Sequence, residues 1–541
     1  MEARTTEFSS RTRAANLERM AQESFDVLVI GGGIVGAGIA RESAVAGLRT
    51  ALVERGDFAG GTSGKTSRLV HGGLRYLRDY RVRLVRQAVQ ERDLLLKNAP
   101  SLVHPLPFLI AAYKDRPPRP LVLRFGLFLY DILSRKKAVP RRVWLHPDES
   151  REREPQLATN GLSGAGVYFD AWTNDARLVL AIVQDAAFAG AVVANYVEVV
   201  ELLREGARVR GARVRDVVTG HIVQVRARIV VNATGVWLDR LRPPRPKPTI
   251  RPTKGSHIFL PRSKVGNRHA LALSARRDGR MVFVIPWGDL TLVGTTDTDF
   301  SGDPQHVLPS IDDVRYLLDV VNEAFPEARV RPDDVVSAFA GLRPLVRAGA
   351  SSSSESDVSR EHAIFEDEDG LISVAGGKLT THRAMAEDVI GRIAARLGKR
   401  LRSQTSNRQL GPAERPLDAF TALGLDEPTA LHLQGRVAPD RLGQYLDAPR
   451  GRDRIVEGAP HIWAEIDLAL QEEMAVSLSD VLVRRLGLFY EAPDQAAHIA
   501  KEVAQRVALL LEWDAARIAT EVRAYEDLVA SHRAFLVDHG G

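Results

Sequence analysis

The stretch that most limits how this chain can fold is residues 25–36, which read FDVLVIGGGIVG. The apolar run that opens it is too short for a buried helix and is bounded by glycine, as an interior β-strand is. Gly31, Gly33 and Gly36 follow with G-x-G-x-x-G spacing. The first permits a tight turn, the second lets backbone N–H groups approach a pyrophosphate, and the third lets the next helix pack on the strand. The pattern predicts a dinucleotide-binding turn.

The residues that follow extend this pattern in the expected order. Residues 36–47 are rich in Ala, Val and Ile and predict a helix that ends at Gly47, and residues 49–54 predict a second strand. Glu54 lies about 20 residues past the glycines, where a carboxylate can accept from both ribose hydroxyls. A lone glycine motif is also typical of an ordinary turn, but strand, turn, helix, strand and acid together favour a nucleotide site. The acid disfavours a 2′-phosphate, so the ligand is FAD or NAD rather than NADP.

Length and composition exclude several classes of protein. A chain of 541 residues suggests roughly three domains. Its formal charge of +6 is mild and its basic residues are spread along the chain, which is no nucleic-acid signature but suits an anionic substrate or membrane surface. Because the chain has no cysteine, disulfides, thiolate nucleophiles and cysteine-ligated metals are excluded. Any redox chemistry therefore needs a cofactor.

One region, residues 116–142, raises the question of contact with a membrane surface. Residues 1–24 are polar and predict a loosely ordered tail with one helical turn near 17–20, and no stretch is apolar for long enough to span a bilayer. Residues 116–142 carry apolar residues between basic flanks. This segment is either a buried helix of a substrate domain or an element that lies on anionic lipid through its basic rim.

The remaining chain shows a coarse order of strands and helices. Gly, Ser and Thr fill residues 56–77, which favours a segment along the cofactor over a solvated loop. A strand at 226–232 ends in Asn-Ala-Thr-Gly, and residues 371–398 read as strand, glycine turn and helix. Further expected strands are 165–170, 191–225 and several within 253–300; further expected helices are 80–97, 176–188, 311–325, 427–433, 460–475, 478–487 and 495–510.

No metal site is predicted. Residues 297–302 match the first half of a calcium-binding loop, with acidic or hydroxyl residues at positions 1, 3 and 5 and glycine at position 6. Position 12, which requires a bidentate carboxylate, is Leu308. The segment is therefore expected to be a turn between strands.

Six motifs in order carry a resemblance to a known family. The chain contains GGGIVGAGIA, HGGLRYL, KGSHI, VIPW with GTTD, GLRPL and GGKLTTHR. It resembles the FAD-dependent, quinone-linked glycerol-3-phosphate dehydrogenases of the D-amino-acid-oxidase-like flavoprotein superfamily over residues 24–400, and more weakly over 460–490. The resemblance implies oxidation of sn-glycerol 3-phosphate to dihydroxyacetone phosphate, with hydride passing from C2 to flavin N5 and electrons passing to membrane quinone.

The resemblance also implies an architecture and a location. We expect an α/β protein with a Rossmann-like FAD-binding domain, an antiparallel-sheet substrate domain and an all-α C-terminal domain. The expected bounds are about 25–115, 165–250 and 335–400 for the FAD part, 116–164 and 251–334 for the substrate part, and 410–541 for the helical domain. Relatives suggest a cytoplasmic homodimer, peripheral on the inner face of the cytoplasmic membrane. The N-terminal tail and the loop at Ser351–Ser354 depart from the family pattern.

Arginine and histidine supply the expected substrate site. A phosphate dianion suits the forked donors of arginine, and Arg75 and Arg343 match the family's substrate-binding arginines. Oxidation of an alcohol needs a base, for which His257 is the first choice and His71 the second. Lys378 is expected near the flavin pyrimidine or the substrate, and Tyr76 beside the substrate or the ring. The predicted catalytic residues are His257, Arg343 and Lys378, and all five of Arg75, Tyr76, His257, Arg343 and Lys378 are predicted to bind substrate.

The expected FAD-binding residues lie in the glycine-rich segments and beside Glu54. They are Gly31, Gly33, Ile34, Gly36, Glu54, Arg55, Thr62, Ser63, Ser67, Leu69, His71, Gly72, Gly73, Ala233, Thr234, Gly235, Gly377, Lys378, Leu379 and Thr380.

Three functional alternatives remain open. They are an oxidase that delivers electrons to oxygen, an amine oxidase of the same superfamily, and a non-catalytic flavin sensor.

Overall fold

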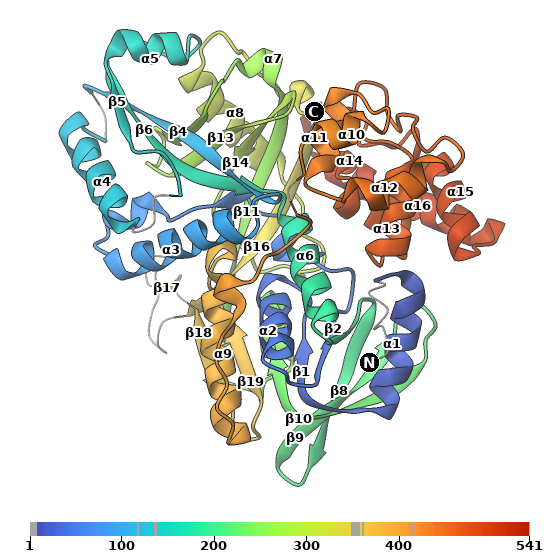
Figure 1. The fold of residues 1–541 in the computed structure, drawn as a ribbon. Coiled ribbons are helices and arrows are strands. Elements are labelled where there is room, and N and C mark those ends of the chain that lie inside the picture. Colours follow the sequence, from blue (N-terminus) through green and yellow to red (C-terminus); the bar gives the residue numbers. More distant parts are fainter. Residues whose placement is uncertain are drawn as a thin grey trace.

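The structure is a computed structural model that describes residues 8–115, 118–134, 138–347, 358–359, 362–413 and 415–539. Among these residues the strands form two sheets, of eight and eleven strands, and the helices beyond residue 415 form a third body beside them (Figure 1). The loop at Ser351–Ser354 lies outside the described residues. The expected α/β fold with an antiparallel second sheet and a helical C-terminal region is confirmed.

The first sheet is built around β1 (Ser24–Ile30), the apolar strand before the glycines. Parallel neighbours flank it on both sides, so the carboxyl ends of these strands share one edge. The sheet order is β18 (Ala363–Glu366), β19 (Ile372–Ala375), β10 (Ile222–Asn232), β1, β2 (Thr50–Val53) and β7 (Val192–Ala194), with β9 (Arg208–Asp216) paired to β10 and β8 (Val197–Glu205) paired to β9.

Both faces of β1 are buried, as the consecutive apolar residues at 27–30 predict. Val27 and Val29 point into the core beneath α2 (Ile34–Val45), α6 (Asp175–Phe188) and α9 (His382–Leu397). Leu28 and Ile30 point into the opposite core, which includes side chains of β8 and β9. Successive strand residues face opposite sides, so the apolar residues from Val27 to Ile30 fill two cores.

The prediction of a loosely ordered N-terminal tail is wrong from residue 10 onward. Helix α1 (Ser10–Gln22) begins with a capping box between Ser9 and Thr12. Arg13 is buried, pairs with Asp216 and donates from Nε to the Asn195 carbonyl oxygen at 2.8 Å. Composition alone predicts that an arginine lies on the surface. The burial of Arg13 was not predictable because its partners lie about 200 positions away in the chain.

The second sheet is mostly antiparallel. Its order is β17 (Val358–Ser359), β16 (Ser337–Arg347), β11 (Ile250–Pro261), β14 (Leu290–Gly294), β13 (Met281–Trp287), β12 (Ala270–Ser274), β4 (Val103–Tyr113), β6 (Leu162–Thr173) and β3 (Leu69–Val70), with β15 (Thr298–Asp299) paired to β11 and β5 (Val143–Leu145) to β6. The expected antiparallel sheet within residues 253–300 is confirmed.

Five strands that the predicted division grouped with the FAD part lie in the second sheet. There β4 and β3 pair with β6, β16 pairs with β11, and β17 pairs with β16. Alternating patterns identify strands but not their partners, because pairing is set by contacts remote in sequence. The domain bounds themselves stay a prediction.

Helices cover the second sheet and form the C-terminal body. Those beside the sheet are α3 (Val82–Asn98), α4 (Pro120–Leu133), α5 (Pro147–Arg153), α7 (Arg262–Val265) and α8 (Ile311–Ala324). The C-terminal body contains α10 (Asp418–Thr421), α11 (Glu427–Gln434), α12 (Pro439–Leu446), α13 (Ala464–Glu472), a π-helix at Asp480–Arg485, α14 (Leu488–Glu491), α15 (Ala500–Leu511) and α16 (Ala515–Arg533). In the described part of the chain, no helix combines the length and apolar character that crossing a bilayer requires.

Candidate functional site

The glycine turn after β1 is packed too closely for side chains. A Cβ at Gly31 would lie 2.6 Å from the Ala233 carbonyl oxygen, and one at Gly36 would lie 1.8 Å from the Gly31 carbonyl oxygen. Gly33 caps α2 without a side-chain hydrogen bond. The turn therefore brings the N–H groups at the positive end of α2 to the carboxyl edge of the first sheet, as an anion site requires.

Glu54 lies beside this turn, as the sequence pattern predicts. Its carboxylate accepts from the backbone N–H of Gly32 at 2.6 Å and of Gly56 at 2.8 Å. Burial raises the pKa of Glu54, and these two N–H groups partly oppose that rise. The adjacent Arg55 instead forms an ion pair with Glu198 at 3.3 Å.

The segment after Glu54 connects the glycine turn to the second sheet. The Ser63 hydroxyl accepts from the Ile34 N–H at the start of α2 (2.9 Å), and the Thr62 hydroxyl donates to the Leu342 carbonyl oxygen (2.6 Å). Farther along, Leu69 is a buried residue of β3. The His71 N–H donates to the Thr380 hydroxyl at 3.1 Å. Residues 62–73 therefore lie between the glycine turn and the second sheet.

The two remaining glycine segments reach the same edge. Ala233 donates its N–H to the Ile30 carbonyl oxygen at 2.9 Å, so residues 233–235 lie beside the end of β1. Gly377 follows β19, and a Cβ there would lie 2.3 Å from the Met385 sulfur on α9. Segments 31–36, 54–73, 233–235 and 377–380, separated in sequence, are therefore brought together as predicted.

Three predicted cationic residues gather next to this edge. The Lys378 ammonium is buried, has no hydrogen-bond partner and lies 4.0 Å from the centroid of the Tyr76 ring. The Arg75 guanidinium lies 5.1 Å from the same ring, and its charge acts on both Lys378 and Arg343. Burial, reinforced by Arg75, lowers the pKa of Lys378 to about 7. Repelling cations held this close favour binding of an anion.

Arg343 on β16 is held in place by residues that the sequence analysis did not assign to the site. Its guanidinium donates to the Thr295 hydroxyl (3.0 Å), the Thr296 carbonyl oxygen (3.1 Å) and the Asp297 carboxylate (3.1 Å). Burial lowers the pKa of Arg343, and Asp297 opposes this. The GTTD motif therefore orients Arg343. The sequence offered one signal for this role, which is that GTTD directly follows an expected strand of the same sheet. The expected turn at residues 297–302 is wrong in part, because Thr298 and Asp299 form β15 and pair with β11.

His257 is a buried imidazole that is neutral rather than cationic. Its Nε2 lies 2.8 Å from the Ser67 hydroxyl, its Nδ1 has no hydrogen-bond partner, and its ring stacks on Phe339 with centroids 4.9 Å apart. Burial, with the charges of Arg343 and Arg68, lowers the pKa of His257 to about 3. Burial and the charge of Lys378 likewise lower the pKa of His71 to about 3. Both histidines are therefore uncharged near neutral pH.

A buried polar cluster that the sequence analysis missed supports the loop that carries Arg75. The Asp170 carboxylate accepts from the Tyr130 hydroxyl (2.7 Å), the Arg92 guanidinium (2.8 Å) and the Gly72 N–H (3.2 Å). The Gly72 N–H also donates to the Tyr130 hydroxyl oxygen at 2.9 Å. Because these residues come from α3, α4 and β6, no local sequence motif predicts the cluster.

One group among the described residues has the composition of a metal site. The ligand atoms of His432, His461 and Glu465 lie within 4.8 Å of one another in the C-terminal body. However, Glu465 already accepts from the Arg436 guanidinium, from His432 at 2.9 Å and from the Ile462 N–H at 2.9 Å. We therefore interpret the group as a buried ionic cluster, and the absence of a metal stays a prediction.

The fold and the site define a dinucleotide-binding protein with an adjoining cluster of cations, and comparison with known proteins specifies it further. The family model of FAD-dependent oxidoreductases matches residues 26–392, and the model for the C-terminal domain of alpha-glycerophosphate oxidase matches residues 381–518. The chain therefore belongs to the FAD-dependent oxidoreductase family, and within it to the group of glycerol-3-phosphate dehydrogenases and alpha-glycerophosphate oxidases.

Relatives of both kinds match nearly the whole chain. A glycerol-3-phosphate dehydrogenase of Mycobacterium leprae is 39% identical over 95% of this chain and 89% of its own length. An alpha-glycerophosphate oxidase of Streptococcus pneumoniae is 34% identical over 95% of this chain and 97% of its own. The solved glycerol-3-phosphate dehydrogenase of Bacillus halodurans, complexed with FAD, superposes with a TM-score of 0.82 at 29% identity, covering 98% of this chain and 99% of that one.

The residues present fit the FAD cofactor that the family uses. The glycine turn leaves no room for a Cβ, the α2 cap residue Gly33 has no side chain to occupy the helix N-terminus, and the Lys378 ammonium is buried without a hydrogen-bond partner. These are the backbone donors and the positive charge that a pyrophosphate and a flavin ring system accept. Which side chains touch FAD stays a prediction.

We expect Lys378 to control the pH dependence of substrate capture. Its pKa of about 7 means that it is charged below pH 7 and loses its charge as the pH rises. For an anionic substrate, kcat/KM should therefore fall above pH 7 in the native protein, by roughly tenfold, and Lys378→Met should lose this limb. The exposed Lys399 provides the control variant Lys399→Met. An unchanged profile in Lys378→Met would assign the limb to another group.

Proposed function

We propose that the protein oxidises sn-glycerol 3-phosphate to dihydroxyacetone phosphate, with bound FAD accepting hydride from C2 at flavin N5 and electrons passing on to membrane quinone. The observation that carries this proposal is the cluster of Arg75, Arg343 and Lys378 beside the nucleotide edge. Arginine binds phosphate with forked donors, and two arginines suit a phosphate dianion better than a single carboxylate. The names of the relatives support the same substrate.

The reaction divides between binding and proton removal. Arg343 and Arg75 hold the phosphate, and Lys378 adds a positive charge beside the reacting end of the substrate. As hydride leaves C2, the C2 hydroxyl loses its proton to a base and the carbon–oxygen bond becomes a carbonyl. His257 takes that role because it is neutral near pH 7, and the Ser67 hydroxyl fixes the orientation of its ring. His71 is the second candidate.

The proposed electron acceptor is quinone, and oxygen is the alternative. Support for quinone comes from α4, because its outer face exposes apolar side chains. On its inner face, Tyr130 contacts Gly72 in the loop that carries Arg75. The oxygen alternative is favoured by the identity to the S. pneumoniae oxidase. The proposal places the protein in the cytoplasm, as a homodimer peripheral on the inner face of the cytoplasmic membrane. Membrane fractionation and gel filtration test these two statements.

The test is anaerobic mixing of the purified yellow protein with sn-glycerol 3-phosphate while the visible flavin band is recorded. We expect bleaching that neither glycerol nor the enantiomeric phosphate reproduces. Subsequent addition of oxygen or a quinone analogue should restore the band, and the faster of the two identifies the acceptor class. Retention of the band with FAD present would contradict the proposal and favour an amine oxidase or a silent flavoprotein.

A further inference from the structure

Helix α4 presents an apolar face that is largely exposed. Leu123, Leu127 and Tyr130 point inward and are buried. On the opposite face, spaced by three or four residues, Leu121, Phe125, Phe128 and Ile132 are 78, 67, 46 and 56% exposed. The helix lies at the edge of the molecule, away from the C-terminal body (Figure 1). Large apolar side chains gathered on one exposed face mark an interaction site.

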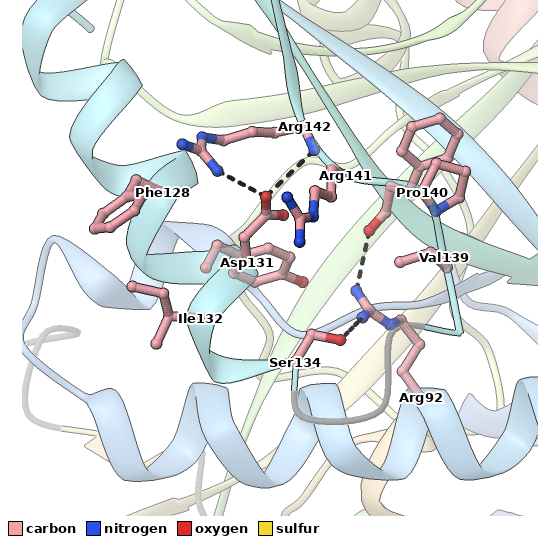
Figure 2. Close-up of a pocket in the computed structure, with 11 residues that line it drawn as sticks. Arg92, Phe128, Asp131, Ile132, Ser134, Val139, Pro140, Arg141 and Arg142 are labelled. Carbon is pink, nitrogen blue, oxygen red and sulfur yellow. Dashed lines mark hydrogen bonds and ion pairs between the residues drawn. The ribbon is translucent and has the colours of Figure 1, made fainter.

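A pocket of about 470 Å³ lies at the C-terminal end of this face. Phe128 and Ile132 form its apolar rim, while Arg92 and Ser134 form part of its polar wall (Figure 2). Arg92 donates to the Ser134 hydroxyl at 3.3 Å and is fully buried. A ligand here would therefore meet apolar side chains on one side and hydrogen-bonding groups on the other.

Two arginines at the pocket differ in their partners. Arg142 donates to the Asp131 carboxylate at 2.8 Å and lies 5.0 Å from the centroid of the Phe128 ring. Arg141 points toward the pocket (Figure 2), and no described residue forms an ion pair with it. Arg92 pairs with Asp93 and Asp170, and Arg142 pairs with Asp131, so Arg141 is the arginine of the pocket lining whose charge no described carboxylate neutralises. The pocket is thus suited to one anionic group.

We propose that this pocket binds the phosphodiester headgroup of an anionic phospholipid, with Arg141 as its cation and the outer face of α4 in contact with the acyl chains. The inference rests on the peripheral membrane association in the proposed function and names its site. Along residues 118–134 and 138–145, Arg119, Arg124, Arg141 and Arg142 outnumber the single acidic residue Asp131. A basic rim around an apolar helix face matches an anionic bilayer surface.

An anionic phospholipid fits both the Arg141 charge and the apolar face of α4. A soluble phosphate would use Arg141 but would leave the apolar side chains of Phe125, Phe128 and Ile132 in water. A neutral apolar surface would cover the helix face but would leave the charge of Arg141 without a counterion. An anionic lipid supplies the phosphate oxygens and the hydrocarbon in one molecule.

The experiment is co-sedimentation of the purified holoenzyme with two kinds of vesicle, one of phosphatidylcholine alone and one of phosphatidylcholine mixed equally with phosphatidylglycerol. Arg141→Gln should weaken binding to the mixed vesicles by about fivefold and leave binding to the neutral vesicles unchanged. Phe125→Ser with Ile132→Ser should weaken binding to both. Matched controls on the C-terminal body are the exposed residues Arg523, as Arg523→Gln, and Leu509, as Leu509→Ser.

The possible outcomes distinguish a headgroup site from membrane association without such a site and from a site for free phosphate. Equal binding of native protein and Arg141→Gln to the mixed vesicles would overturn the headgroup site while leaving membrane association intact. Absence of native binding to any vesicle would overturn membrane association as well. Release from mixed vesicles by inorganic phosphate, at constant ionic strength, would identify a free-phosphate site instead. Flavin bleaching by sn-glycerol 3-phosphate in detergent should be the same in all variants, so it tests the proposed reaction separately.

Discussion

Arg343→Ala is expected to lower kcat/KM for sn-glycerol 3-phosphate by about two orders of magnitude, mostly through a higher KM. A hydrogen bond to a charged group is worth about 1.5–3 kcal/mol, and the variant removes a forked pair of such donors. Steady-state kinetics with a quinone analogue measures this loss. The FAD content should stay intact, because Arg343 lies on β16 of the second sheet and its described partners come from the GTTD turn.

Two further variants make the Arg343 prediction specific. Arg343→Lys keeps the charge but lacks the fork, so it should recover only part of the loss. Arg251→Ala is the matched control, because Arg251 lies on the neighbouring strand β11 and pairs with Asp299 at 2.6 Å outside the cluster. Loss of FAD in Arg343→Ala, or an equal loss of activity in Arg251→Ala, would make Arg343 a structural residue.

The nucleotide half of the site was predictable because its signals are local. Strand β1, the glycine turn, α2, β2 and Glu54 follow one another within 31 residues, from Ser24 to Glu54, and each step has its own composition. The glycines are required by contacts with adjacent backbone, such as that of Gly36 with Gly31. Where neighbours in sequence are neighbours in space, pattern arguments suffice.

Features that depend on remote partners were not predictable. Arg13 is buried because it meets Asp216, and β4 belongs to the second sheet because it pairs with β6. The partners of Arg343 and the support of Gly72 by Asp170 likewise join separate segments. For residues 116–142 the buried-helix interpretation describes the inner face of α4, whereas its outer face is exposed and contact of that face with lipid stays a prediction.

The C-terminal body and the nucleotide turn meet at one buried carboxylate. Asp57, three residues after Glu54, accepts from Arg484 at 2.6 Å and from Arg485 at 2.7 and 2.9 Å. Burial alone would raise the pKa of Asp57, but the charges of Arg485 and Arg484 lower it below its ordinary range. The adjacent Phe58 lies under the turn, where a Cβ on Gly32 would come within 2.7 Å of its ring. Asp57 therefore couples the helical body to the FAD-binding turn.

Asp57→Ala is expected to lower the free energy of unfolding by about 3–5 kcal/mol, because it removes the carboxylate that two buried guanidinium groups share. Holoenzyme denaturation in urea measures this change, and the flavin released at fixed protein concentration should rise in parallel. The lowered pKa fixes the sign with pH: the stabilisation from Asp57 is complete above the ordinary aspartate pKa and is lost as the pH falls below it. The native and variant curves should therefore converge in acid.

The milder variant Arg484→Lys keeps one charge near Asp57 and guards against failure of Asp57→Ala to fold. It should lower the unfolding free energy by less than Asp57→Ala and still increase flavin release, because lysine cannot reproduce the contacts of Arg484 with both Asp57 and Asp480. Asp148→Ala is the control, since Asp148 is 89% exposed in its pair with Arg151 and such pairs are worth about 0–1 kcal/mol. Destabilisation without flavin release would mean that Asp57 joins the two bodies but does not hold the FAD-binding turn.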